Sequence, residues 1–87
     1  MILQVAIKPN PFKSTIQLDV TCEYSRQVIV RMFNDTGRII RMFSWYLVSG
    51  TNVTAINELR NIEEGIYMVD IINHEGDVLY STRLTKE

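Results

Sequence analysis

Apolar residues alternate with polar ones, position by position, in almost every apolar segment of this 87-residue chain. The run IQLDV at residues 16–20 is the clearest case. A period of two puts successive side chains on opposite faces of a strand, so that one face can be buried while the other meets water. Because spacings of three and four are confined to Leu59 and Ile62, the pattern predicts an all-β fold.

Seven segments carry this alternation at a spacing typical of a sandwich or a barrel. They are residues 3–8, 14–20, 26–33, 38–48, 52–56, 66–73 and 78–85. The side chains predicted to be buried are Ile16, Leu18, Val28, Val30, Tyr67, Val69 and Ile71, together with Val78, Tyr80 and Leu84 in the last segment. Arg83 and Thr85 fall on the opposite face of that last strand.

Two short polar segments predict hairpin tips. NDTG at residues 34–37 and NHEGD at residues 73–77 each join two apolar runs with residues that tolerate positive φ. Asp35 and His74 are therefore interpreted as turn residues rather than catalysts. Residues 57–65 predict one helical turn, ended by Gly65 as a C-cap, which brings Leu59 or Ile62 onto the edge of the sandwich.

Composition argues against most catalytic and ligand-binding classes. Nine Lys plus Arg against ten Asp plus Glu give a net charge of −1, so no attraction to nucleic acid is expected. The single cysteine, Cys22, excludes an internal disulfide and a multi-cysteine metal site. No glycine-rich phosphate loop or metal-ligand spacing occurs, and a chain of this length has little room for a deep cleft. We expect a non-enzymatic domain without cofactor or metal.

A cluster of arginine and aromatic residues surrounds the first predicted hairpin. It consists of Arg31, Arg38 and Arg41 with Phe33, Phe43, Trp45 and Tyr46. Such a composition is typical of a protein-binding hot spot. It is equally typical of an ordinary sheet in which arginine stems lie over large rings, and we favour that interpretation.

The opening residues lack a secretory signal, and no later apolar run reaches the length of a membrane span. Taken alone, this predicts a soluble intracellular protein. If the chain is a piece of a longer precursor, the export signal would lie upstream of Met1.

Four stretches resemble a known family in their order and spacing. They are PNPF followed by STIQLDV, VIVRMFNDTGRII, GTNVTAINELRNIEEGIYMVDI, and GDVLYSTRLTK. The chain is similar to the type A C-terminal sorting domain of the type IX (Por) secretion system of Gram-negative bacteria. The positions that carry the likeness are Pro9, Asn10, Pro11, Gly37, Arg38, Asn52, Gly65, Tyr67 and Gly76.

The resemblance implies an immunoglobulin-like antiparallel β-sandwich that serves as a non-catalytic address. In the family, the domain follows a larger passenger and is read by the translocon, which includes an outer-membrane shuttle barrel and a sortase-like peptidase. The peptidase usually removes the domain and attaches the passenger to a surface lipopolysaccharide. The resemblance thus implies export through the periplasm to the outer membrane, the cell surface or the medium. Residues 1–8 would be a first strand or the end of the passenger linker, and residues 9–87 the sorting domain.

The family's closing pattern, two lysines around two apolar residues, appears here as Arg83, Leu84, Thr85 and Lys86. These four residues are the candidates for recognition by the translocon. If the last strand lies at a sheet edge, its backbone could also accept a strand from a receptor. The alternatives are a stand-alone module for carbohydrate binding or cell-surface adhesion and, least favoured, a small enzyme.

Overall fold

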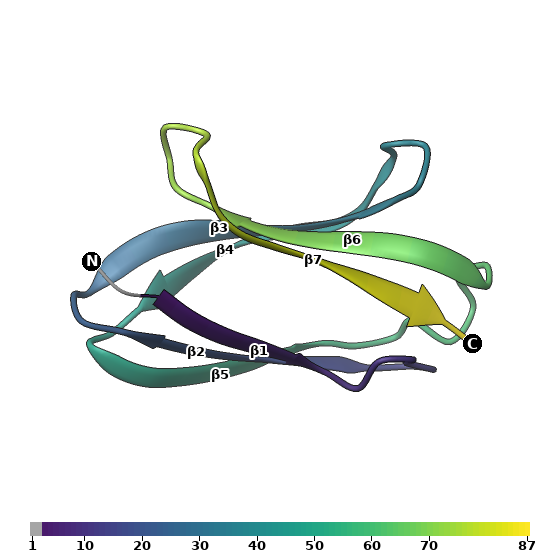
Figure 1. Ribbon diagram of the computed structural model, residues 1–87, viewed down its shortest axis with the longest axis horizontal. Coiled ribbons are helices and arrows are strands. Elements are labelled where there is room, and N and C mark those ends of the chain that lie inside the picture. Colours follow the sequence, from purple (N-terminus) through teal and green to yellow (C-terminus); the bar gives the residue numbers. More distant parts are fainter. Residues whose placement is uncertain (1–2) are drawn as a thin grey trace.

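Alternation of buried and exposed side chains produces seven strands in the computed structural model, which describes residues 3–87. They are β1 (Leu3–Lys8), β2 (Ile16–Cys22), β3 (Arg26–Asn34), β4 (Ile39–Leu47), β5 (Gly50–Ile56), β6 (Gly65–Ile72) and β7 (Val78–Lys86). Figure 1 shows two layers, with strand orders β1-β2-β5 and β4-β3-β6-β7. All five strand pairs within the sheets are antiparallel. The immunoglobulin-like β-sandwich expected from the sequence is confirmed.

The chain passes repeatedly between the two layers. β3 and β4 form one hairpin and β6 and β7 another, both in the four-stranded sheet. The connections from β2 to β3, from β4 to β5 and from β5 to β6 cross from one sheet to the other. As a result β3 and β6 are the central strands of their sheet, and β4 and β7 are its edges.

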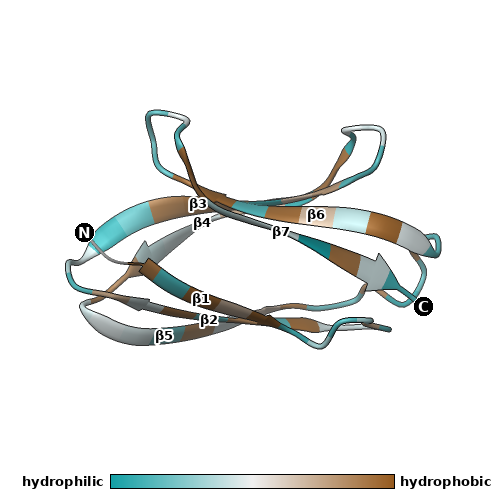
Figure 2. Ribbon diagram, viewed as in Figure 1, coloured by the Kyte–Doolittle hydropathy of each residue, from teal (hydrophilic) through white to brown (hydrophobic). Residues whose placement is uncertain are grey.

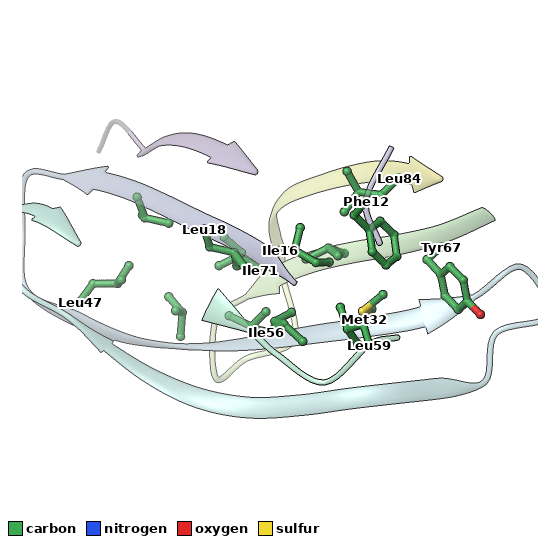
Figure 3. Close-up of a cluster of buried hydrophobic side chains, with 14 of the residues drawn as sticks. Phe12, Ile16, Leu18, Met32, Leu47, Ile56, Leu59, Tyr67, Ile71 and Leu84 are labelled. Atoms are coloured by element: carbon green, nitrogen blue, oxygen red, sulfur yellow. The ribbon is translucent and has the colours of Figure 1, made fainter. Parts of the chain in front are cut away.

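The core fills the space between the two sheets, and Figure 3 shows its largest side chains. All seven positions that the alternation of β2, β3 and β6 predicts to be buried are buried, each with at most 5% exposure. Leu84 is also buried and Tyr80 packs partly against the core. Burial of apolar side chains between the two sheets supplies most of the stability of a small sandwich.

The two hairpin tips have the same construction. Oδ1 of Asn34 and Oδ1 of Asn73 each accept hydrogen bonds from the backbone N–H groups two and four residues later, at 2.8–3.1 Å. The fourth residue of each tip is a glycine with positive φ, 87° at Gly37 and 90° at Gly76, where a side chain would be strained. Both predicted tips are confirmed.

A β-bulge follows each tip and bends the hairpin. Ile40 is an extra residue in β4, and Leu79 is an extra residue in β7. Because a bulge bends its strand and increases the twist, both hairpins curve away from the three-stranded sheet (Figure 1). The extra residue also shifts the alternation, so that Val78 pairs with Ile72 and faces outward with 54% exposure; its predicted place in the core is wrong.

The connection from β5 to β6 contains a turn and no helix. Leu59 is fully buried and Ile62 is half-buried, which confirms that this segment contributes to the core. The backbone N–H of Leu59 donates to the carbonyl oxygen of Ser14 at 2.9 Å, and one local bond, from the N–H of Ile62 to the carbonyl oxygen of Leu59 at 3.3 Å, closes the turn. Gly65, expected to be a helix C-cap, instead begins β6 with φ 142°.

Candidate functional site

The candidate site is the closing strand, β7, which forms one edge of the four-stranded sheet. Its alternation divides the four recognition candidates between two faces. Arg83 is exposed and Thr85 half-buried on the outer face, whereas Leu84 points into the core with 2% exposure. The edge position and the outer face of Arg83 and Thr85 agree with the sequence analysis.

Lys86 lies on the core side of β7, in the same alternation as Leu84, and is 6% exposed. Its Nζ donates a hydrogen bond to the carbonyl oxygen of Glu87 at 2.6 Å. The Lys86 ammonium thus donates to a backbone carbonyl at the end of the core, while the aliphatic part of the side chain is buried. Lys86 therefore presents no exposed charge on the outer face of β7.

Residues 9–12, here called the strap, cover the outer edge of β7 at its end. The backbone N–H of Phe12 donates to the carbonyl oxygen of Thr85, and the N–H of Glu87 donates to the carbonyl oxygen of Phe12, both at 2.9 Å. Oδ1 of Asn10 accepts the N–H of Thr85 at 3.0 Å, and Nδ2 of Asn10 donates to the carbonyl oxygen of Arg83 at 3.4 Å. The edge is therefore not open to strand addition over residues 83–87, contrary to the expectation from sequence.

Phe12 fixes the strap to the core. Its side chain is fully buried, and its ring meets that of Tyr67 edge-on with centroids 6.1 Å apart. Figure 3 shows Phe12 beside Leu84 and Tyr67 at one end of the core. The peptide bonds preceding Pro9 and Pro11 are both cis.

Tyr67 joins this end of the core to the connection before β6. Its hydroxyl donates to the carbonyl oxygen of Glu63 at 2.6 Å. Burial, and to a smaller extent the nearby carboxylates of Glu63 and Asp35, raise the pKa of the Tyr67 hydroxyl above its ordinary value of 10.0. The phenol therefore stays a neutral hydrogen-bond donor at physiological pH.

Asn52, another position of the family likeness, ties the connection between β4 and β5 to β2. Its Oδ1 accepts the N–H of Val48 at 2.9 Å. Its Nδ2 lies within hydrogen-bond distance of the carbonyl oxygens of Val48, Val20 and Gly50, at 3.0–3.3 Å. The residue has a structural role, since it satisfies backbone groups where the chain changes sheets.

The arginine and aromatic cluster is divided between the two faces of the four-stranded sheet. Phe43 and Trp45 pack against the core, whereas Phe33 and Tyr46 lie on the outer face. Outside, Arg31 pairs with Asp70 at 3.1 Å, and its guanidinium carbon lies 5.9 Å from the centroid of the Phe33 ring. This is the arrangement of an ordinary sheet, the interpretation favoured from the sequence.

Apolar and polar residues occur in the strands of both sheets (Figure 2), and exposed large apolar side chains are concentrated on the outer face of the four-stranded sheet. Exposed large apolar side chains on it are Ile39, Met42, Tyr46, Ile66 and Val78. The three-stranded sheet instead presents polar pairs. Lys8 and Asp19 lie 3.4 Å apart, and the side-chain amide of Gln17 donates to Asp19 at 2.9 Å. That hydrogen bond, with help from Lys8, lowers the pKa of the Asp19 carboxyl.

Groups with catalytic or metal-binding potential are dispersed over residues 3–87. Within that range no three His, Cys, Asp or Glu side chains come together as a metal site would require. Cys22 is buried, and its Sγ lies 3.3 Å from the carbonyl oxygen of Val48. A hollow over Arg31, Phe33 and Ile39 has a volume of about 220 Å³, below the usual size of small-molecule sites. No helix in this range is long and apolar enough to cross a membrane.

Sequence reasoning missed the partnership between the strap and β7. It located Pro9, Asn10 and Pro11 only as positions of the family likeness and placed neither Phe12 nor Asn10 against the closing strand. Phe12 breaks the alternation, because it stands alone between Pro11 and two polar residues. An isolated aromatic outside any strand was the available signal.

One comparison with known proteins identifies a family. A family model described as "Secretion system C-terminal sorting domain" matches residues 6–85, from within β1 to Thr85 in β7. A search of curated proteins finds no match to the chain. The match spans nearly the whole sandwich, and the chain therefore belongs to the family of secretion system C-terminal sorting domains.

Proposed function

We propose that this domain is the export address of a passenger protein joined upstream of β1, and that it directs the passenger to the type IX translocon. The family match over residues 6–85 is the observation that carries this proposal. A domain of this family marks a protein that is exported to the cell surface or secreted. Recognition by an outer-membrane shuttle barrel, passage through the periplasm and removal by a sortase-like peptidase complete the proposed route.

The recognition candidates have different parts in this proposal. Arg83 and Thr85 present polar groups on the outer face of an edge strand, where a receptor can contact them. Leu84 and Lys86 face the core and hold the strand in place. In this proposal Arg83 and Thr85 contact the receptor, whereas Leu84 and Lys86 stabilise the strand that carries them. The adhesion alternative gains nothing from Trp45, because that ring packs partly against the core.

The test is a reporter fused upstream of the domain and expressed in a bacterium with a type IX system. Deleting residues 83–87 should leave the reporter in the periplasm, but the deletion also uncovers Phe12 and can unfold the domain. Arg83→Ala changes only an exposed side chain and should alter stability by no more than about 0.5 kcal/mol. Its matched control is Arg60→Ala, in the exposed turn before β6.

Export is measured as reporter at the surface or in the medium against reporter in the periplasm, with thermal melting of each isolated domain in parallel. The proposal predicts that Arg83→Ala lowers export while Arg60→Ala does not, with both domains folded. Normal export of the deletion would refute the address at this strand. Normal export of Arg83→Ala alone would remove Arg83 from the recognised surface.

A further inference from the structure

We propose that the strap is a built-in edge guard: it occupies the backbone of residues 83–87, at the end of β7 and just beyond it, so a partner can add a strand there only by displacing it. The inference concerns the folded domain and holds whichever receptor reads it. It follows from four hydrogen bonds, a buried anchor and the chemistry of proline.

The hydrogen bonds occupy consecutive outward-facing groups of β7. In an antiparallel edge strand, alternate residues direct both backbone N–H and C=O away from the sheet. Here these residues are Arg83, Thr85 and Glu87. The carbonyl oxygens of Arg83 and Thr85 and the N–H groups of Thr85 and Glu87 all have partners in the strap. A receptor strand would need the same groups.

The side chain of Asn10 takes the place of a backbone peptide unit in pairing with β7. Its side-chain amide supplies an acceptor to Thr85 and a donor to Arg83, which are the two groups a neighbouring peptide unit would supply. Phe12 then continues the pairing through its backbone, in a parallel bridge with Lys86. The strap therefore pairs with β7 although only one of its residues forms a regular bridge.

The strap is also held at both ends of its short course. The Phe12 ring is fully buried and meets Tyr67. Shortly after it, the carbonyl oxygen of Ser14 accepts the N–H of buried Leu59 at 2.9 Å. On the other side the strap continues directly into β1, which is paired with β2 along its whole length. Removing the strap from β7 therefore means withdrawing Phe12 from the core.

Pro9 and Pro11 reduce the number of backbone donors that the strap itself offers to a further strand. Proline has no backbone N–H, so these two positions cannot donate to an incoming strand. Prolines on an exposed edge weaken its capacity to pair with a further strand. The part of β7 that stays uncovered is nearer the hairpin, where Ser81 belongs to the same outward-facing series.

Amide hydrogen exchange, measured by NMR on the whole chain, tests the inference. Thr85 and Glu87 amides should exchange at least tenfold more slowly than the Ser81 amide of the same strand. Asn10→Ala should speed exchange at Thr85 about fivefold, the factor that corresponds to one hydrogen bond of about 1 kcal/mol. Asn61→Ala, in an exposed turn, is the matched control and should leave Thr85 unchanged.

A second variant separates loss of the guard from loss of the fold. Asn10→Asp keeps an acceptor for the Thr85 N–H but removes the donor to Arg83, so Thr85 should remain protected. Equal exchange at Thr85 and Ser81 in the unmodified chain would overturn the proposal, as would unchanged exchange at Thr85 in Asn10→Ala. Faster exchange at Val30, in the central strand β3, would mean that Asn10→Ala disturbs the whole fold. In that case Asn10→Asp is the deciding variant, and loss of Thr85 protection in Asn10→Asp refutes the guard. None of these outcomes depends on export. The proposed export function can therefore be refuted while the edge guard is confirmed, and the edge guard can be refuted while the export function is confirmed.

Discussion

Replacing Phe12 with alanine tests whether a residue outside the seven strands is essential to the core. The side chain is fully buried and meets the Tyr67 ring at 6.1 Å. Truncation of a buried phenylalanine costs about 3–5 kcal/mol, of which the ring pair contributes about 0.5–1.5 kcal/mol. A domain of this size has a total stability of about 4–13 kcal/mol. Phe12→Ala should therefore remove a large part of the free energy of unfolding.

Urea denaturation of the isolated domain, followed by far-UV circular dichroism, measures this loss. Tyr24→Ala provides the control, because Tyr24 is 63% exposed and its truncation should change stability by less than about 0.5 kcal/mol. Phe12→Leu keeps an apolar side chain of similar volume and should lose less than about 1.5 kcal/mol. If Phe12→Ala differs from the unmodified domain by less than about 1 kcal/mol, the strap is not anchored in the core and the reasoning is wrong.

Two further predictions concern the central strand β6. Val69→Ala should lower the free energy of unfolding by about 1–3 kcal/mol through lost burial and a small cavity, and an unchanged urea midpoint would place Val69 outside the core. Tyr67→Phe removes the hydrogen bond to Glu63 and should cost about 0.5–1.5 kcal/mol near neutral pH. Because the folded pKa of Tyr67 is raised above its unfolded value of 10.0, the unmodified domain keeps this contribution below pH 10 and loses it as pH rises through the folded pKa. Urea midpoints of Tyr67→Phe and the unmodified domain should therefore converge above pH 10, and a constant gap up to pH 12 would contradict the assignment.

The strands were predictable because each has one buried and one wet face. The alternation of β2, β3 and β6 locates Leu18, Val30 and Val69 correctly, and the predicted strand ends lie within two residues of the observed ones. A period of two is a local signal, and it needs no knowledge of which strands pair. The hairpin tips were predictable for the same reason, since an asparagine and a glycine three residues later specify the turn locally.

The failures occur where a position depends on distant parts of the chain. Asn10 and Thr85 are separated by 75 residues, so nothing near either one indicates their hydrogen bond. The exposure of Val78 depends on a bulge that local alternation does not announce. Lys86, a candidate for recognition, is charged, but its alternation with Leu84 directs it toward the core, and its aliphatic stem allows burial.

The contact between the strap and β7 also sets the order in which the domain can be completed. Phe12 is synthesised before its partners in β7, which follow some 70 residues later. Pairings between distant segments are slow to form, because the intervening chain must first be ordered. A nascent chain that does not yet include Leu84 therefore leaves the Phe12 ring uncovered. The sandwich can close only after β7 has been synthesised.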